Sequence, residues 1–144
     1  DVIEVRKGME AWTAYYAAQR AQPEDVLKLQ KIVENMRQNL ENVSPSEDLD
    51  ANFHIVIARA TRNVVWLHLM QSFYEALKVF QQSVWRAVYL TEEDHRTLYE
   101  HHSRIYEAIR DRDPERARDA MLRHLDFAEK RSSAYLSQTR QAAV

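Results

Sequence analysis

Hydrophobic residues recur along this chain at the three- and four-residue spacing of amphipathic helices, without the alternation that marks strands. Combined with helix-start and helix-stop signals, the pattern predicts six helices. They cover about residues 2–21, 23–42, 45–60, 64–88, 91–110 and 114–138, and the last residues, 139–144, are expected to fray. Short polar turns join them, so the expected fold is all-α, a single antiparallel helical bundle.

The predicted helix starts carry capping residues. "SPSE" at residues 44–47 has the spacing of a capping box. Asn63 and Thr91 are the expected N-caps of the fourth and fifth helices. For the sixth helix, Asp113 is the expected N-cap and Pro114 the expected first helical residue.

The first and fourth helices differ in character. In the first, Val5, Met9, Trp12, Tyr16 and Ala17 repeat at helical spacing and form its expected apolar face. The fourth is long and rich in large apolar side chains, and we expect it to bend or break along its length.

Composition narrows the function classes. The chain of 144 residues has one glycine and no cysteine, which excludes phosphate-cradling glycine loops, disulfides and thiolate metal sites. A net charge of −2 lacks the basic surplus of a stand-alone nucleic-acid binder. No membrane span or signal peptide is visible, so a cytoplasmic location without membrane contact is expected. Because the sequence starts within a helical pattern, we expect a further domain before residue 1.

Three predicted helices each place a histidine on a core-facing side. These are His54, His102 and His124, and Asp50 lies one turn before His54. The last turn centres near Arg112, ten residues after His102 and twelve before His124, so in an antiparallel hairpin the two histidines lie nearly level. If the third helix packs beside this hairpin, four ligand-type side chains meet inside the bundle.

Imidazoles and a carboxylate without thiolate suit a divalent transition metal, with zinc first and nickel, manganese or iron as alternatives. Three nitrogens and one oxygen leave one or two coordination positions open. The simpler interpretation, core histidines and a helix-surface hydrogen bond, stays open at this stage. We expect no metal-binding role for His68, His95 and His101.

The same residues allow two other functions. A metal-dependent hydrolase or lyase is the alternative, since three histidines with an open position also describe a hydrolytic zinc site. Glu10, Glu75 and Glu107 are the candidate general bases, but nothing in the sequence directs them to the site. A metal-free helical dimerisation module is the third interpretation.

Four segments resemble a known family when taken in order. They are "EVRxxME" (4–10), "DANFHxxIAxATxN" (50–63), "EHHxxIxxAIxxxD" (100–113) and "AxxxMxxHL" (117–125). This set resembles the FadR C-terminal-type (FCD) effector-binding domain of bacterial GntR-superfamily transcription regulators. The resemblance covers nearly the whole chain.

The resemblance implies a non-enzymatic all-α domain over residues 1–144 that binds a small organic acid. In metal-containing members the ligands match Asp50, His54, His102 and His124, and the acid completes the coordination. Arg6 would help to hold the acid, and Asn63 would lie near the pocket. A winged helix-turn-helix domain would precede residue 1 and bind operator DNA as a homodimer.

Some roles keep a simpler alternative. Arg6 could be a solvated residue or form a salt bridge with Glu10, and Asn63 could be only a helix cap. "EAWTAxxAAxRA" (10–21) and "YL" (89–90) are most similar to the lactate-utilisation regulators, which makes lactate or a similar 2-hydroxy or keto acid the expected effector. Trp12 and Trp66 are candidate anchors of the dimer interface.

Overall fold

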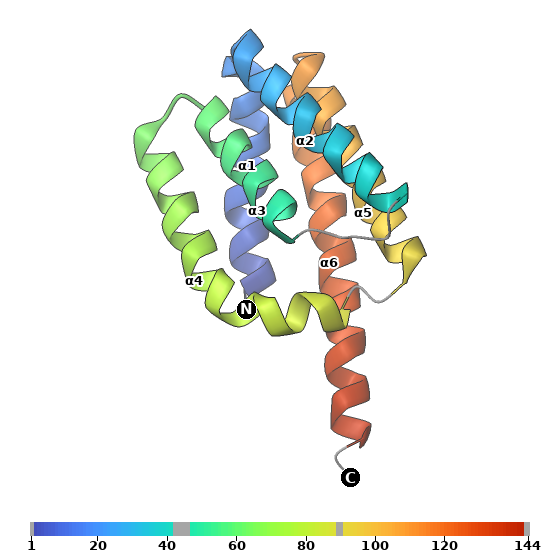
Figure 1. Cartoon of the computed structure of the whole chain (residues 1–144). Coiled ribbons are helices and arrows are strands. Elements are labelled where there is room, and N and C mark those ends of the chain that lie inside the picture. Colours follow the sequence, from blue (N-terminus) through green and yellow to red (C-terminus); the bar gives the residue numbers. More distant parts are fainter. Residues whose placement is uncertain (1, 42–46, 89–90, 143–144) are drawn as a thin grey trace.

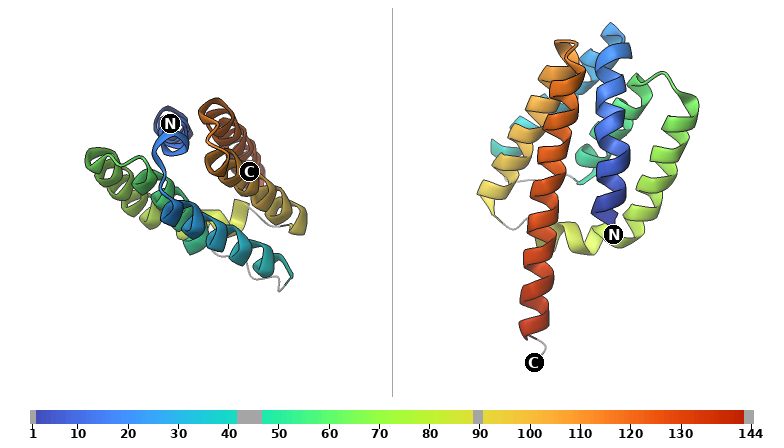
Figure 2. Two further views of the ribbon diagram at one scale, coloured as in Figure 1. Left: turned by 90° about the horizontal axis from the view of Figure 1, so that it is seen from above. Right: turned by 180° about the vertical axis from the view of Figure 1, so that it is seen from behind.

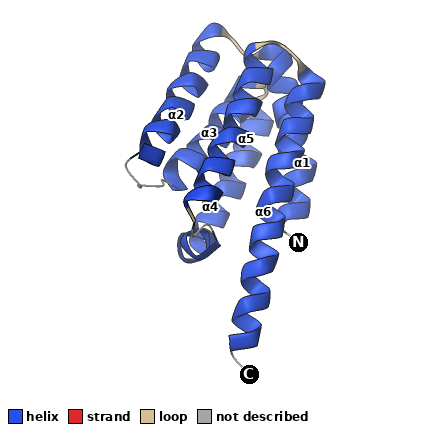
Figure 3. Ribbon diagram, turned by 90° about the vertical axis from the view of Figure 1, so that its right-hand side faces the viewer, coloured by secondary structure: helices blue, strands red, loops and turns tan. Residues whose placement is uncertain are grey.

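Six α-helices form the computed structural model of the chain, which describes residues 2–41, 47–88 and 91–142. They are α1 (Val2–Arg20), α2 (Pro23–Glu41), α3 (Glu47–Ala60), α4 (Val64–Val88), α5 (Glu92–Arg110) and α6 (Pro114–Ala142). No strand occurs within these ranges, and the predicted all-α class is confirmed (Figure 3). No helix in the described part of the chain is both long enough and apolar enough to cross a bilayer.

The helices pack as a bundle in which α1 contacts α3, α5 and α6. α2 packs against α3 and α5, and α4 packs mainly on α3 (Figures 1 and 2). α4 bends sharply, as its sequence predicts, so that its second half runs across the end of the bundle (Figure 1). The C-terminal part of α6 extends past the other helices (Figure 1).

Most helix bounds agree with the sequence prediction, with one correction at the C-terminus. α6 continues to Ala142, so the expected fraying is wrong for residues 139–142. Gln and Ala favour helix, and nothing in "TRQA" breaks the backbone hydrogen bonding. The first three residues of the "SPSE" capping box and the "YL" pair at 89–90 lie outside the described residues.

The other predicted caps are present. Thr91 Oγ1 accepts a hydrogen bond from the Asp94 amide, and the Asp94 carboxylate accepts one from the Thr91 amide, which completes a capping box. Asn63 Oδ1 accepts from the amides of Val65 and Trp66, at 3.0 and 3.3 Å. These bonds satisfy backbone donors that a helix start leaves unpaired.

Two arginines take the left-handed conformation that turns usually assign to glycine. Arg62 ends the α3–α4 turn region with φ 56°, and Arg112 does the same between α5 and α6 with φ 60°. Arg62 also donates to the buried Asp25 carboxylate at 2.6 Å. Arg112 Nη1 donates to the Gln19 carbonyl at 3.4 Å. Such contacts offset the backbone cost of the left-handed conformation in turns that lack glycine.

The predicted apolar face of α1 is confirmed at Ala17, which is buried, and is wrong at Val5 and Trp12. Val5 and Trp12 are 46% and 44% exposed. The buried side instead consists of small or charged residues, Arg6, Glu10, Ala11, Thr13, Ala14, Ala17 and Ala18. The alanines let α1 approach its neighbouring helices closely, and the larger side chains of Val5 and Trp12 lie at the surface. Arg6 and Glu10, two ionisable groups on a buried face, need partners to offset the cost of burial.

A main apolar core joins α1, α2, α3, α5 and α6. Its largest fully buried members are Phe53, Leu29, Ile57, Ile105, Ile109, Met121 and Leu125. A second cluster, with Met70 and Leu77, lies between α3 and α4. The candidate site lies where these two clusters meet. Phe53, next to His54 in sequence, belongs to the first cluster, and Ala58, one helical turn after His54, belongs to the second.

Candidate metal centre and effector site

The structure brings together Asp50, His54, His102 and His124. Each offers one ligand atom, and these four atoms all lie within 4.8 Å of one another. α3 supplies Asp50 and His54, α5 supplies His102 and α6 supplies His124. The three histidines are 1–2% exposed, and the Asp50 side chain is 13% exposed. The sequence interpretation of a surface hydrogen bond therefore does not hold for these histidines.

Helix phase and register produce this convergence. The rings of His102 and His124 are level across the α5–α6 hairpin, with centroids 4.6 Å apart. The His54 ring centroid is 5.2 Å from that of His124 and 5.7 Å from that of His102. Apolar neighbours one turn away hold each helix in this phase, as Ile105 and Met121 do for α5 and α6.

The unsatisfied polar atoms fit a cation. Nε2 of His54, Nε2 of His102 and Nδ1 of His124 are buried and make no hydrogen bond. Asp50 Oδ1 lies 3.2 Å from His102 Nε2 and 4.0 Å from His54 Nε2. Buried polar atoms without partners are costly, and several in one place require an explanation. An ion that accepts lone pairs from all four residues supplies one.

Glu10 also belongs to the site, which the sequence analysis did not predict. Its Oε2 lies 2.7 Å from His54 Nδ1, at ion-pair distance although not aligned as a hydrogen bond. A carboxylate there favours a proton on Nδ1 and leaves the Nε2 lone pair for a metal. The available signal was the phase of α1, which puts Glu10 on the same face as Ala14 and Ala17.

Arg6 is buried beside Glu10 and does not extend into solvent. Its Nε donates to Glu10 Oε1 at 2.6 Å, and its Nη2 donates to the Tyr74 hydroxyl at 2.9 Å. The Tyr74 hydroxyl in turn donates to Glu10 Oε2 at 3.1 Å. The salt-bridge alternative for Arg6 is therefore present, and the solvated alternative is wrong. Its role in holding an acid stays a prediction.

Burial and neighbouring charges shift the pKa values in this cluster. Burial lowers the pKa of His124 well below its ordinary value, with His102 and His54 acting in the same direction. Burial also lowers the pKa of His102, although Asp50 opposes the shift. Neutral imidazoles are the form that binds a metal, so this environment favours the ligand state.

The two carboxylates are held ionised in spite of burial. Burial alone would raise the pKa of Glu10, but the Arg6 charge and the His54 contact bring it well below the ordinary value. Burial likewise opposes the lowering at Asp50, where the His102 contact prevails. The site thus contains two carboxylates and one guanidinium in their charged forms.

Aromatic rings close the site on two sides. The Tyr74 ring stacks on His54 with centroids 5.6 Å apart, and the Phe53 ring meets His102 edge-on at 4.7 Å. Both rings are buried. They exclude water from the cluster, which strengthens the electrostatic interactions within it.

Asn63 differs from these residues, because it is exposed and its Oδ1 caps α4. Only its amide nitrogen remains as a donor for a ligand. His68 is exposed and His95 and His101 are half-buried, so none of them joins the four-residue cluster. Among the candidate bases, Glu75 is exposed and Glu107 pairs with Arg116 at 3.2 Å.

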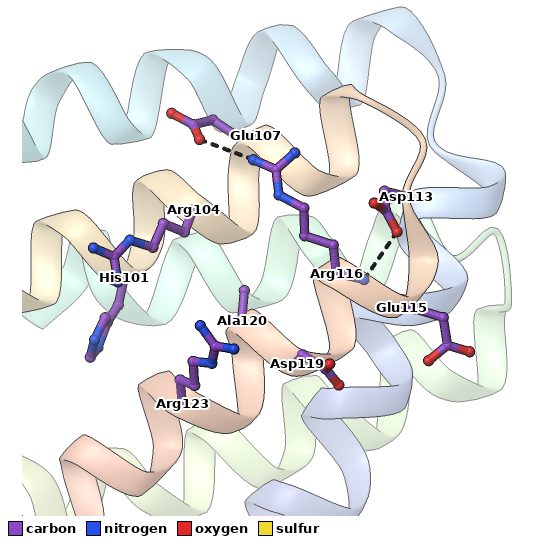
Figure 4. A pocket seen from close by; sticks show the side chains of 9 residues that line it. All are labelled: His101, Arg104, Glu107, Asp113, Glu115, Arg116, Asp119, Ala120 and Arg123. Atoms are coloured by element: carbon purple, nitrogen blue, oxygen red, sulfur yellow. Dashed lines mark hydrogen bonds and ion pairs between the residues drawn. The ribbon is translucent and has the colours of Figure 1, made fainter.

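A separate charged groove runs between α5 and α6 (Figure 4). Its volume is about 610 Å³. It is lined by His101, Arg104, Glu107, Asp113, Glu115, Arg116, Asp119, Ala120 and Arg123. Acidic and basic side chains both line it, and Arg116 pairs with Glu107 within it. The groove contains none of the four ligand candidates.

Sequence comparison places the chain among known regulators. The FCD domain family matches residues 1–127. The "Putative L-lactate dehydrogenase operon regulatory protein" of Escherichia coli K12 is 35% identical over 127 residues, which is 88% of this chain and 48% of that protein. "HTH-type transcriptional regulator LutR" of Bacillus subtilis 168 is 30% identical over 142 residues, covering 97% and 64%. The chain thus spans about half the length of the first of these relatives.

Solved structures share the fold. A Streptococcus agalactiae GntR chain superposes with a TM-score of 0.76 at 24% identity, covering 90% of this chain and 57% of that one. Escherichia coli McbR/YncC gives a TM-score of 0.75 at 14% identity, covering 96% and 64%. At these identities the likeness concerns the fold alone. With the family match over residues 1–127, it follows that the chain belongs to the FCD domain family of GntR-type transcription regulators.

Proposed function

We propose that this chain is the ligand-sensing domain of a bacterial metabolite-responsive transcription regulator. It binds a small organic acid, lactate or a similar 2-hydroxy or keto acid, at a buried divalent metal. The observation that carries the proposal is the group of three unpaired, buried imidazole nitrogens beside Asp50. A bound metal would give all of these nitrogens a partner.

Zinc is the proposed metal, with nickel, manganese and iron as alternatives. Asp50, His54, His102 and His124 would hold it, and this nitrogen-rich set without thiolate suits all four ions. When bound, the metal offers open coordination positions to the oxygens of an acid. A 2-hydroxy acid presents two such oxygens and can chelate.

Arg6 is the proposed partner of the acid's carboxylate, because its guanidinium is buried beside the cluster and keeps Nη1 free of the bonds to Glu10 and Tyr74. Guanidinium and carboxylate match in geometry and charge. Asn63 is proposed as a second contact through its amide nitrogen. The relative named for an L-lactate dehydrogenase operon supports lactate as the acid.

Regulation would pass to DNA through a further domain. We infer a winged helix-turn-helix domain before residue 1, since the chain covers only 48% and 64% of the two named relatives and one of them is named as HTH-type. The acid can shift DNA binding only if it binds two arrangements of the bundle unequally. The regulator would act in the cytoplasm, where operator DNA lies.

A homodimer is the proposed assembly. Trp12 is 44% exposed on α1, and the nearby Val5 is 46% exposed. Trp66 is less available, since it is half-buried and its indole nitrogen donates to Thr13 Oγ1. Trp12 is therefore the better candidate anchor of the two.

The enzyme alternative, a metal-dependent hydrolase or lyase, has less support. The named relatives are transcription regulators. Glu10 is near enough to act as a base, but it is already bonded to Arg6 and contacts His54. A general base must be free to reach the proton that it removes.

Calorimetric titration of L-lactate into the zinc-loaded and metal-free chain tests the proposal. We expect saturable one-site binding to the zinc-loaded chain and weak or absent binding to the metal-free chain. Lactamide, which has the same shape without the charge, is the matched control and should not bind. Equal affinity of lactate for both forms would contradict the proposal.

A further inference from the structure

The charge of the candidate site follows from the residues whose burial the structure describes. Among these residues, the buried side chains that carry a charge, apart from histidine, are Arg6, Glu10, Asp25 and Asp94, and Asp50 is nearly buried. Asp25 pairs with Arg62 at 2.6 Å, and Asp94 pairs with Arg131 at 2.7 Å. Those two pairs neutralise themselves elsewhere in the bundle. The site therefore keeps one cation, Arg6, and two anions, Glu10 and Asp50.

Arg6 is neutralised before any ligand arrives. Its Nε lies 2.6 Å from Glu10 Oε1, and Tyr74 links the two groups by hydrogen bonds at 2.9 and 3.1 Å. The next cation on α1, Lys7, pairs with Asp126 and Glu129 on α6 at 2.7 and 2.8 Å. Lys7 thus has carboxylate partners of its own on α6, and Arg6 is the cation of α1 that lies at the site.

We propose that Glu10 is a specificity-determining residue, which sets the charge of the metal-loaded site so that it accepts an acid with one carboxylate and rejects acids with two. The inference rests on the proposed function. One positive and two negative side chains leave the site with a net charge of minus one, and a divalent metal makes it plus one. A monocarboxylate brings it to zero.

A dicarboxylate would leave an uncompensated negative charge among buried groups. Such a charge is costly where water is excluded, and the Tyr74 and Phe53 rings enclose this site. Glu10 itself would repel the second carboxylate. Because Glu10 also contacts His54 Nδ1, it combines two roles, orienting a metal ligand and setting the charge.

Glu10→Gln removes the charge and keeps the shape, so the loaded site would carry plus two. Calorimetry with L-lactate and L-malate on the zinc-loaded chain measures the ratio of the two affinities. We expect the parent to prefer lactate by about tenfold or more, and the variant to lower this ratio by at least about tenfold. Asp25→Asn, which removes a buried carboxylate from another ion pair, is the matched control and should leave the ratio unchanged.

The double variant Arg6→Gln/Glu10→Gln provides a test that does not depend on a stable single variant. It removes one charge of each sign, so the loaded site returns to plus one and the parent preference for lactate should persist, with weaker binding of both acids. A lactate-to-malate ratio that is unchanged by Glu10→Gln, or altered tenfold in the double variant, overturns the role of Glu10. The proposed sensing function survives that result. A zinc-loaded parent that binds neither acid overturns both the role of Glu10 and the proposed function.

Discussion

Oε2 of Glu10 on α1 lies 2.7 Å from Nδ1 of His54 on α3. This contact joins the helix that carries Arg6 to the helix that carries two of the four candidate ligands. A carboxylate behind a ligating imidazole fixes the ring and raises its basicity. The candidate metal site and the proposed acid-binding site would therefore share one residue.

Replacing Glu10 with glutamine should weaken zinc binding by about 10- to 100-fold, because His54 loses the partner that orients it. Competition with a chromophoric chelator measures the change. Asp25→Asn serves as control, since Asp25 is equally buried but pairs with Arg62. Identical zinc affinity in the Glu10 variant and the parent would show that the contact does not support the metal.

Metal removal should lower thermal stability. At a free zinc concentration of about 100 times the Kd, binding adds about 2.7 kcal/mol to the free energy of unfolding. For a chain of this size that corresponds to a Tm shift of very roughly 8 °C. Calorimetric melting with and without a chelator measures it. In Asp50→Ala/His124→Ala the chelator should have no effect, and a shift of equal size there would contradict the assigned ligands.

The metal-free chain should lose stability as pH falls. His102 and His124 have pKa values lowered by burial, so the unfolded chain takes up protons from about pH 6.5 downward while the folded chain resists. Their contribution is thus present above about pH 6.5 and is lost as pH falls toward the lowered folded pKa. Asp50 and Glu10, whose pKa values are also lowered, extend the loss below about pH 4. Melting temperatures at pH 8, 7, 6 and 5 in chelator should fall, most steeply below pH 6.5, and a flat series would contradict this.

Asn63 has two roles that one substitution separates. Asp is as good an N-cap as Asn, so Asn63→Asp should keep the melting temperature, whereas Asn63→Ala should cost about 1 kcal/mol. If the amide nitrogen contacts the acid, Asn63→Asp should also weaken lactate binding by about tenfold or more, because it replaces a donor with a negative charge. Unchanged lactate affinity with an unchanged melting temperature would leave Asn63 as a cap only.

Sequence reasoning located the helices and the four ligand candidates because each depends on local phase. His102 and His124 each share a face with apolar residues, and the short turn at Arg112 determines their register. The caps at Thr91 and Asp113 likewise depend on neighbouring residues alone.

The face of α1 could not be read in the same way. Its large residues, Val5 and Trp12, suggested an apolar face, yet close packing selects the alanines and leaves these two exposed. Glu10 was missed for the same reason, because its partners His54 and Tyr74 lie on α3 and α4. Contacts between distant segments decide such positions, and periodicity within one helix does not contain them.

Metal content of the purified chain tests the central claim most directly. Inductively coupled plasma mass spectrometry should find about one equivalent of a divalent transition metal in the parent and in His68→Ala, whose histidine is exposed. Asp50→Ala/His124→Ala should contain little metal even after soaking with zinc or nickel. A parent that takes up no metal after the same soaking would contradict the account and return the buried histidines to a structural role.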